Sequence, residues 1–200
     1  MRIHTIGDSH CVSGWNKIHK FDIFIHHLGP VLCYSFGQEP LQRCKITEYN
    51  ILEEDIIIFS LGEIDCRCHI HKYITPILSY KHIIEEIVNT YIKSIVTCVK
   101  LLDKKLKYIC VFNVLPPVNK KDVCENPAFP FLGDDEERKQ YVLYFNKKLK
   151  EVCLQTNIIY IDIYDKCTDF NGFLKKEISD GSVHMINSNI IESFINDNFS

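Results

Sequence analysis

The sequence has 200 residues, of which 46% are hydrophobic and 24% charged, a composition that excludes a disordered or fibrous chain and fits a globular protein. The length suits one domain, residues 1–200, with a substantial buried core. The formal net charge of −3 provides no basic field, so we expect neither a nucleic acid nor an anionic membrane as a partner.

Runs of apolar residues alternate with polar segments along the chain. In order, they predict a strand over 2–6, a short helix or loop over 10–20, strand-like segments over 21–26 and 31–35, a weakly helical stretch over 37–54, a strand over 56–60, a helix over 82–102, a strand over 108–115, a surface loop over 119–133, a helix over 134–155, a strand over 158–163 and a helix over 189–199. Because strands alternate with helices, we expect a parallel, doubly wound α/β sheet.

Two of these segments carry the clearest patterns. Residues 56–60, Ile-Ile-Ile-Phe-Ser, are apolar without alternation, which is typical of a parallel strand covered on both faces. Over 82–102, apolar residues recur every three or four positions and form one face of a helix. Both patterns predict elements that pack in the core.

The cysteines and the start of the chain bear on the cellular compartment. The sequence contains ten Cys, and several of them lie in apolar runs, where a free thiol packs as a small hydrophobe. Met1 and Arg2 lead directly into an apolar run without a signal peptide, and no apolar stretch reaches the length of a membrane span. We expect a cytoplasmic protein with mostly buried, reduced cysteines.

Polar residues stand at the ends of several predicted strands. Ser9 follows the first strand, Gly62 follows the strand over 56–60, and Asn113 ends the next. His184 comes after the last strand. Because the carboxyl ends of parallel strands share one edge of a sheet, we expect these residues to converge in one site.

Ser9, His184 and Asp180 are candidates for nucleophilic catalysis. A serine hydroxyl becomes a good nucleophile when an imidazole removes its proton, and a carboxylate then holds the imidazole in the required tautomer. We expect Ser9 to be the nucleophile, His184 the base and Asp180 the residue that orients it. If residues 180–184 form a helical turn, Asp180 and His184 lie on the same face of it.

An ester carbonyl under attack also needs donors for its developing negative charge. The backbone N–H of Ser9 and of either Gly29 or Gly62 are candidates, and Asn113 or Arg67 offers a side-chain donor. Asp8, beside the nucleophile, is predicted to be a structural hydrogen-bonding residue. Asp and Ser are also favoured N-cap residues, so Asp8 and Ser9 after a strand equally suit the start of a helix. The nucleophile hypothesis therefore depends on His184 and the other motifs.

These motifs, which span nearly the whole chain, resemble the sequence blocks of the SGNH (GDSL-type) hydrolases in the correct order. Gly7-Asp8-Ser9 is similar to the first block, Gly29 to the second-block glycine, Gly62-Glu63-Ile64-Asp65 to the third block, and the segment from Asp180 to His184 to the fifth. Residues 62–67, Gly-Glu-Ile-Asp-Cys-Arg, together with Arg138, resemble a subgroup with a GEIDCR-like third block. The resemblance implies a flavodoxin-like, three-layer α/β/α sandwich around a mainly parallel five-stranded sheet, and ester hydrolysis without a metal or other cofactor.

Two positions depart from the family pattern. The third block usually has an Asn where Ile64 stands, and Ile cannot donate a hydrogen bond. Loss of one such donor typically lowers the rate by about 10²–10³. The family's Asp usually stands three residues before its His, whereas Asp180 stands four residues before His184.

The segment Cys66-Arg67-Cys68-His69-Ile70-His71 contains residue types that bind zinc. The usual zinc spacing needs a second, distant pair of ligands, and none is evident. We therefore expect Glu63, Asp65 and Arg67 to form a charged network at the rim of the site. Arg138 either pairs with these carboxylates or is an ordinary charge on the surface of a helix.

The sequence thus predicts a serine esterase that cleaves a small or carbohydrate-borne acyl ester. Acyl transfer to a glycan by the same residues remains an alternative, and so does a non-catalytic binding domain, because Ile64 replaces a donor. The expected partner is a small-molecule or glycan ester, and the oligomeric state is left open.

Overall fold

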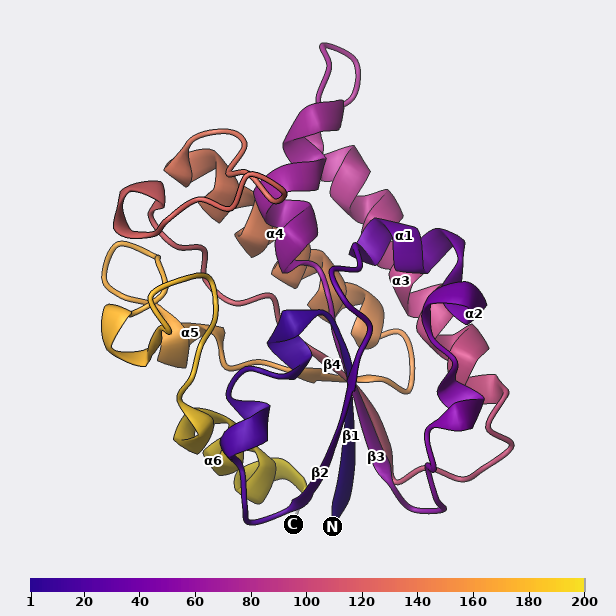
Figure 1. Cartoon of the computed structure of the whole chain (residues 1–200). Helices are drawn as coiled ribbons and strands as arrows, with labels where there is room; N and C mark the ends of the chain where they lie inside the picture. Colours follow the sequence, from indigo (N-terminus) through magenta and orange to yellow (C-terminus); the bar gives the residue numbers. More distant parts are fainter. Residues whose placement is uncertain (200) are drawn as a thin grey trace.

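The computed structural model describes residues 1–199 (Figure 1). At its centre lies a five-stranded sheet with the order β2-β1-β3-β4-β5. The strands are β1 (Arg2–Gly7), β2 (Asp22–His27), β3 (Ile56–Ser60), β4 (Tyr108–Phe112) and β5 (Ile159–Ile161). All neighbouring strands are parallel, so the predicted doubly wound sheet is confirmed.

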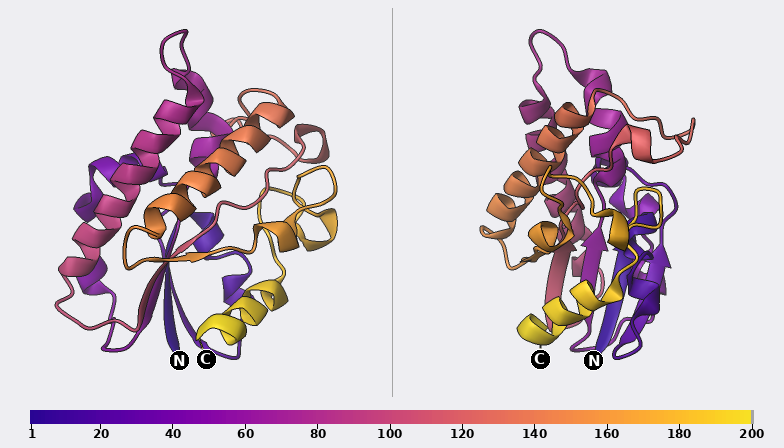
Figure 2. Two further views of the ribbon diagram at one scale, coloured as in Figure 1. Left: turned by 180° about the vertical axis from the view of Figure 1, so that it is seen from behind. Right: turned by 90° about the vertical axis from the view of Figure 1, so that its left-hand side faces the viewer.

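Helices cover both faces of this sheet (Figure 2). The helices are α1 (Cys33–Gln38), α2 (Pro40–Arg43), α3 (Tyr80–Lys100), α4 (Asp135–Cys153), α5 (Tyr164–Cys167) and α6 (Ser188–Phe199). One apolar core lies between the sheet and α1, α3 and α4, and a second lies between the sheet, Trp15 and α6. The result is the predicted three-layer α/β/α architecture.

The residues of β3 explain why its sequence shows no alternation. Ile57 and Phe59 pack in the core with α3, whereas Ile56 and Ile58 pack in the core with α6. Each of these four side chains is fully buried. Both faces of the central strand therefore require apolar residues.

The long helices form where the sequence predicts them. The buried residues of α3 recur every three or four positions, from Ile83 and Ile84 to Ile95. Helix α4 begins with a capping box, in which the Asp134 carboxylate accepts the Glu137 N–H at 2.8 Å and the Glu137 carboxylate accepts the Asp134 N–H at 2.8 Å. Burial of one face thus defines both helices, and a capped start also defines α4.

The prediction of a strand over 31–35 is wrong, because this segment begins helix α1. The Asp65 carboxylate accepts the backbone N–H of Cys33 at 2.6 Å and that of Tyr34 at 3.1 Å. It thereby satisfies donors that the first turn of a helix leaves free. A residue distant in the sequence, in a π-helical turn over Asp65–His69, therefore determines the local conformation.

Nine of the ten cysteines are buried, all ten are free, and Cys124 is the exposed one. The prediction that most cysteines pack in the core is confirmed. Within residues 1–199, no helix combines the length and the apolar composition that a bilayer crossing requires.

Candidate active site

The site lies at the carboxyl ends of β1 and β3, where the direction of strand winding reverses and open α/β sheets bind ligands. β1 ends at Gly7, whose Cα is so close to β3 that a Cβ would lie 1.9 Å from the Ser60 carbonyl oxygen. Only glycine permits this approach. After it, a 3₁₀ turn over Ser9–Cys11 begins, and Asp8 caps this turn by accepting the His10 N–H at 2.9 Å.

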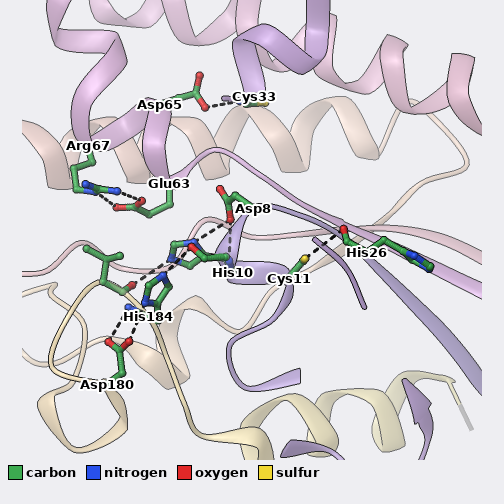
Figure 3. A network of polar contacts seen from close by, with 12 residues as sticks. Asp8, His10, Cys11, His26, Cys33, Glu63, Asp65, Arg67, Asp180 and His184 are labelled. Carbon is green, nitrogen blue, oxygen red and sulfur yellow. Dashed lines mark hydrogen bonds and ion pairs between the residues drawn. The ribbon is translucent and has the colours of Figure 1, made fainter. Parts of the chain in front are cut away.

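The structure brings together Ser9, His184 and Asp180. The Ser9 Oγ lies 2.8 Å from the His184 Nε2, and the His184 Nδ1 lies 2.9 Å from the Asp180 Oδ2. Figure 3 shows the imidazole of His184 facing the Asp180 carboxylate. These contacts form a continuous hydrogen-bonded chain from carboxylate to hydroxyl.

The segment that carries His184 is a tight loop and not the expected helical turn. Ser179 and Met185 form an antiparallel bridge across it, and the Asp180 N–H donates to the His184 carbonyl at 3.0 Å. The loop reverses the chain, so the two side chains face one another despite their spacing of four residues.

The charge on Asp180 determines the tautomer of His184. Partial burial raises the pKa of Asp180, but hydrogen bonds from His184 and the Ser182 N–H outweigh it and hold this pKa below its usual value. The ionised carboxylate accepts the Nδ1–H of His184. The Nε2 lone pair of a neutral ring then faces Ser9 and can accept its proton.

A cavity of about 250 Å³ opens beside Ser9 and His184. Its walls include Pro30, Ile64 and Phe131. A larger cavity of about 670 Å³ lies beside α3 and the segment 156–158, but no His, Ser or Cys lines it. The smaller cavity is therefore the candidate substrate site.

Arg67 lies in the wall of the small cavity, with three of its five N–H donors engaged. Its Nε and Nη2 donate to the Glu63 carboxylate at 2.7 and 3.0 Å, and its Nη1 donates to the Phe129 carbonyl. Burial lowers the pKa of Arg67, but the charge of Glu63 outweighs this effect and raises it. The predicted ion pair of Glu63 and Arg67 is thus present, while Asp65 caps α1 instead.

The structure does not bring Asn113 or Gly62 into this cavity. The Asn113 amide donates to the Val114 carbonyl at 2.9 Å and accepts the Ile163 N–H at 3.0 Å, so it joins two strand ends inside the core. A Cβ on Gly62 would lie 2.9 Å from atoms of both Phe145 and Val114, which places this glycine against the core. Neither residue lines the cavity beside Ser9.

Gly29 lies between His27 and Pro30, which both line the cavity. Its φ of 79° is in the left-handed region, which glycine adopts without strain. Within residues 1–199, neither its N–H nor that of Ser9 donates to a backbone acceptor. These groups remain available for a ligand.

Arg138 does not pair with Glu63, and the histidines of the segment 66–71 contact aromatic residues. Arg138 is buried and pairs with Asp135, and it also donates to the Gly133 carbonyl at 2.7 Å, so it neither joins the Glu63 network nor lies on the helix surface. His71 contacts the Tyr141 hydroxyl at 3.2 Å, and His69 lies against the ring of Tyr34. Within the described residues, no group of three or more His, Cys, Asp or Glu side chains is placed to hold a metal.

The residue that the sequence analysis missed is His10. Its imidazole is buried between the Asp8 carboxylate and the Val183 carbonyl and lies beside the ring of His184 (Figure 3). The signal was present, because a histidine directly follows Ser9. Its partner Val183 lies 173 residues away in the sequence, so no local pattern revealed the contact.

No family model matches the sequence, and no curated protein matches it. Solved structures share its fold. A protein from Streptococcus pneumonia is 15% identical with a TM-score of 0.64, covering 98% of this chain and 82% of its own. A member of the lipolytic G-D-S-L family from Veillonella parvula is 14% identical with a TM-score of 0.58, and the match covers 100% of this chain and 98% of that protein. A mutant of an acetylxylan esterase from Geobacillus stearothermophilus is 11% identical with a TM-score of 0.57, covering 100% and 94%. The chain therefore has the three-layer α/β/α fold of the SGNH hydrolases.

Proposed function

We propose that this protein is a serine esterase of the SGNH/GDSL type, in which Ser9 is the nucleophile, His184 the general base and Asp180 the residue that orients it. The hydrogen-bonded chain from Asp180 through His184 to Ser9 is the observation that carries the proposal. The fold, shared with a G-D-S-L protein and an acetylxylan esterase, supports it.

The reaction proceeds in two steps. The Ser9 Oγ attacks the ester carbonyl while the His184 Nε2 takes its proton, and a tetrahedral intermediate forms. When the bond between the acyl carbon and the alcohol oxygen breaks, His184 returns the proton to the departing alcohol. Water, activated by the same imidazole, then hydrolyses the acyl-enzyme and frees Ser9.

The oxyanion is stabilised by the backbone N–H groups of Ser9 and Gly29. Ile64 lines the cavity but has no donor, and the guanidinium of Arg67 is held by Glu63 and by a carbonyl. A site with fewer donors stabilises the tetrahedral intermediate less, so we expect modest rates.

The cavity favours a small acyl group, such as acetyl. Its volume of about 250 Å³ lies below the roughly 300–1,000 Å³ that drug-sized ligands occupy. Ile64, Pro30 and Phe131 supply apolar walls for a methyl group. We expect acetyl esters, including acetylated sugars, to be cleaved faster than long-chain esters, and faster cleavage of long-chain esters would contradict this specificity.

Labelling with a fluorophosphonate probe tests the nucleophile. We expect an adduct on Ser9, located by mass spectrometry, that is lost in Ser9→Ala and strongly reduced in His184→Ala. Ser13→Ala is the matched control, because this half-buried serine follows four residues later. A folded wild-type protein without an adduct would refute the esterase and favour the binding-domain alternative.

A further inference from the structure

The turn that carries Ser9 holds a second imidazole, that of His10, whose side chain is only 5% exposed. Its Nδ1 lies 3.1 Å from the Asp8 Oδ1, and its Nε2 lies 3.2 Å from the Val183 carbonyl oxygen. A carboxylate and a carbonyl can only accept hydrogen bonds, so both ring nitrogens must donate. The geometry therefore requires the charged, doubly protonated ring.

We propose that His10 is a positioning residue. Its charged ring links the segment bearing His184 to the turn bearing Ser9 and so fixes the position of the base relative to the nucleophile. This inference rests on the esterase function proposed above. Asp8 directly precedes Ser9, and Val183 directly precedes His184. The two hydrogen bonds of one ring thus join the chain neighbours of both reacting residues.

The surroundings of the ring support this role. The rings of His10 and His184 pack with their centroids 5.0 Å apart. The loop around Asp180 and Gly181 is exposed, and its backbone hydrogen bonds join residues of the same loop. A contact from the rigid end of β1 is therefore an effective anchor for it.

The nearby charges favour a cation at this position. Burial disfavours the imidazolium, but the charges of Asp8 and Glu63 and the Val183 carbonyl outweigh burial and raise the pKa of His10 to about 9. Arg67, on whose pKa the charge of Asp8 also acts, is already paired with Glu63. Among residues 1–199, the only donors to the Asp8 carboxylate are the N–H groups of His10.

The proposal predicts a loss of activity at alkaline pH. A neutral imidazole has only one N–H, so it cannot donate to both Asp8 and Val183. Above a pH of about 9, we expect one of these bonds to break and kcat to fall while KM changes little.

Two double variants isolate the bond to Val183. The amide nitrogen of Gln stands near the position of the His Nε2, and that of Asn near the Nδ1. Asp8→Asn with His10→Gln therefore keeps a donor for Val183, whereas Asp8→Asn with His10→Asn removes it. Replacing Asp8 in both variants avoids a buried unpaired carboxylate, which alone could prevent folding.

We would measure kcat and KM for p-nitrophenyl acetate between about pH 6 and 10.5, with Ser9→Ala as the blank and thermal melts to establish folding. We expect the Asp8→Asn, His10→Asn variant to lose about 10- to 100-fold in kcat, since misplacing a catalytic group by about 1 Å can cost that much. The kcat of the Asp8→Asn, His10→Gln variant should stay within about fivefold of the wild-type value and lack its alkaline decline.

A nitrogen-15 NMR titration of His10 provides a readout that does not depend on activity. We expect both ring nitrogens to be protonated at pH 7, and a neutral ring there would overturn the inference. Equal kcat values in the two double variants, with Ser9 of the wild type still labelled, would overturn the inference and leave the esterase standing. A wild-type protein in which Ser9 does not react would refute both.

Discussion

Among single residues, Ile64 most directly limits the proposed chemistry. It lines the cavity beside Ser9 and is 5% exposed, yet its side chain cannot donate to an oxyanion. In the proposed mechanism, the backbone N–H groups of Ser9 and Gly29 are then the main donors. Each missing donor typically lowers the rate by about 10²–10³.

We therefore predict that Ile64→Asn raises kcat/KM for acetyl esters by about tenfold or more, because an amide donor would face the developing charge. The gain should appear in kcat, since the donor acts in the transition state. Ile64→Leu, which adds no donor, is the control and should not gain activity. Equal rates in the two variants would show that the oxyanion does not form near position 64.

At the scale of elements, Asp65 links two segments that the sequence separates. It lies in the π-helical turn after β3, and its carboxylate caps α1 through the N–H groups of Cys33 and Tyr34. The same turn places Arg67 in the cavity wall. One short element therefore positions both a neighbouring helix and part of the substrate site.

We predict that Asp65→Ala lowers the free energy of unfolding by about 1–2 kcal/mol, because the start of α1 loses its acceptor. Urea unfolding followed by circular dichroism measures the change. Asp165→Ala, at an exposed position of α5, is the control and should stay within about 0.5 kcal/mol of the wild type. A similar stability of both variants would show that solvent caps α1 equally well.

For the whole molecule, the buried pair of Asp8 and His10 couples stability to pH. The pKa of His10 is raised from 6.5 to about 9 in the folded protein, so the folded state binds the proton more tightly than the unfolded chain. The resulting stabilisation is fully present below about pH 6.5 and is lost as the pH rises through about 9.

We predict that this pair contributes up to about 3 kcal/mol to the fall in the free energy of unfolding between pH 6.5 and 9.5. Urea unfolding at several pH values measures it. The Asp8→Asn, His10→Gln variant should decline less steeply, because neither replacement titrates and only the buried Cys thiols, whose pKa values burial raises, still lose stability in alkali. An equal decline in this variant would assign the effect to other groups.

Much of the fold could be predicted because its signals are local. β3 lies between two cores, so every position is apolar, and one face of α3 is buried, so apolar residues recur with the helical period. The convergence of Ser9 and His184 also followed from the sequence, because parallel strands present their carboxyl ends at one edge. The catalytic roles of these residues stay predictions.

Other features depend on contacts between segments that are distant in the sequence. Residues 33–35 begin helix α1 instead of a strand, with Asp65 capping it, and the loop bearing His184 is fixed by pairing rather than by a helical turn. The sequence shows where Asn113 and His10 stand, but it does not show that Asn113 binds the Ile163 N–H or that His10 binds the Val183 carbonyl. Local periodicity therefore encodes the long, regular elements, whereas the short elements and the direction of each polar side chain depend on the partners that folding brings beside them.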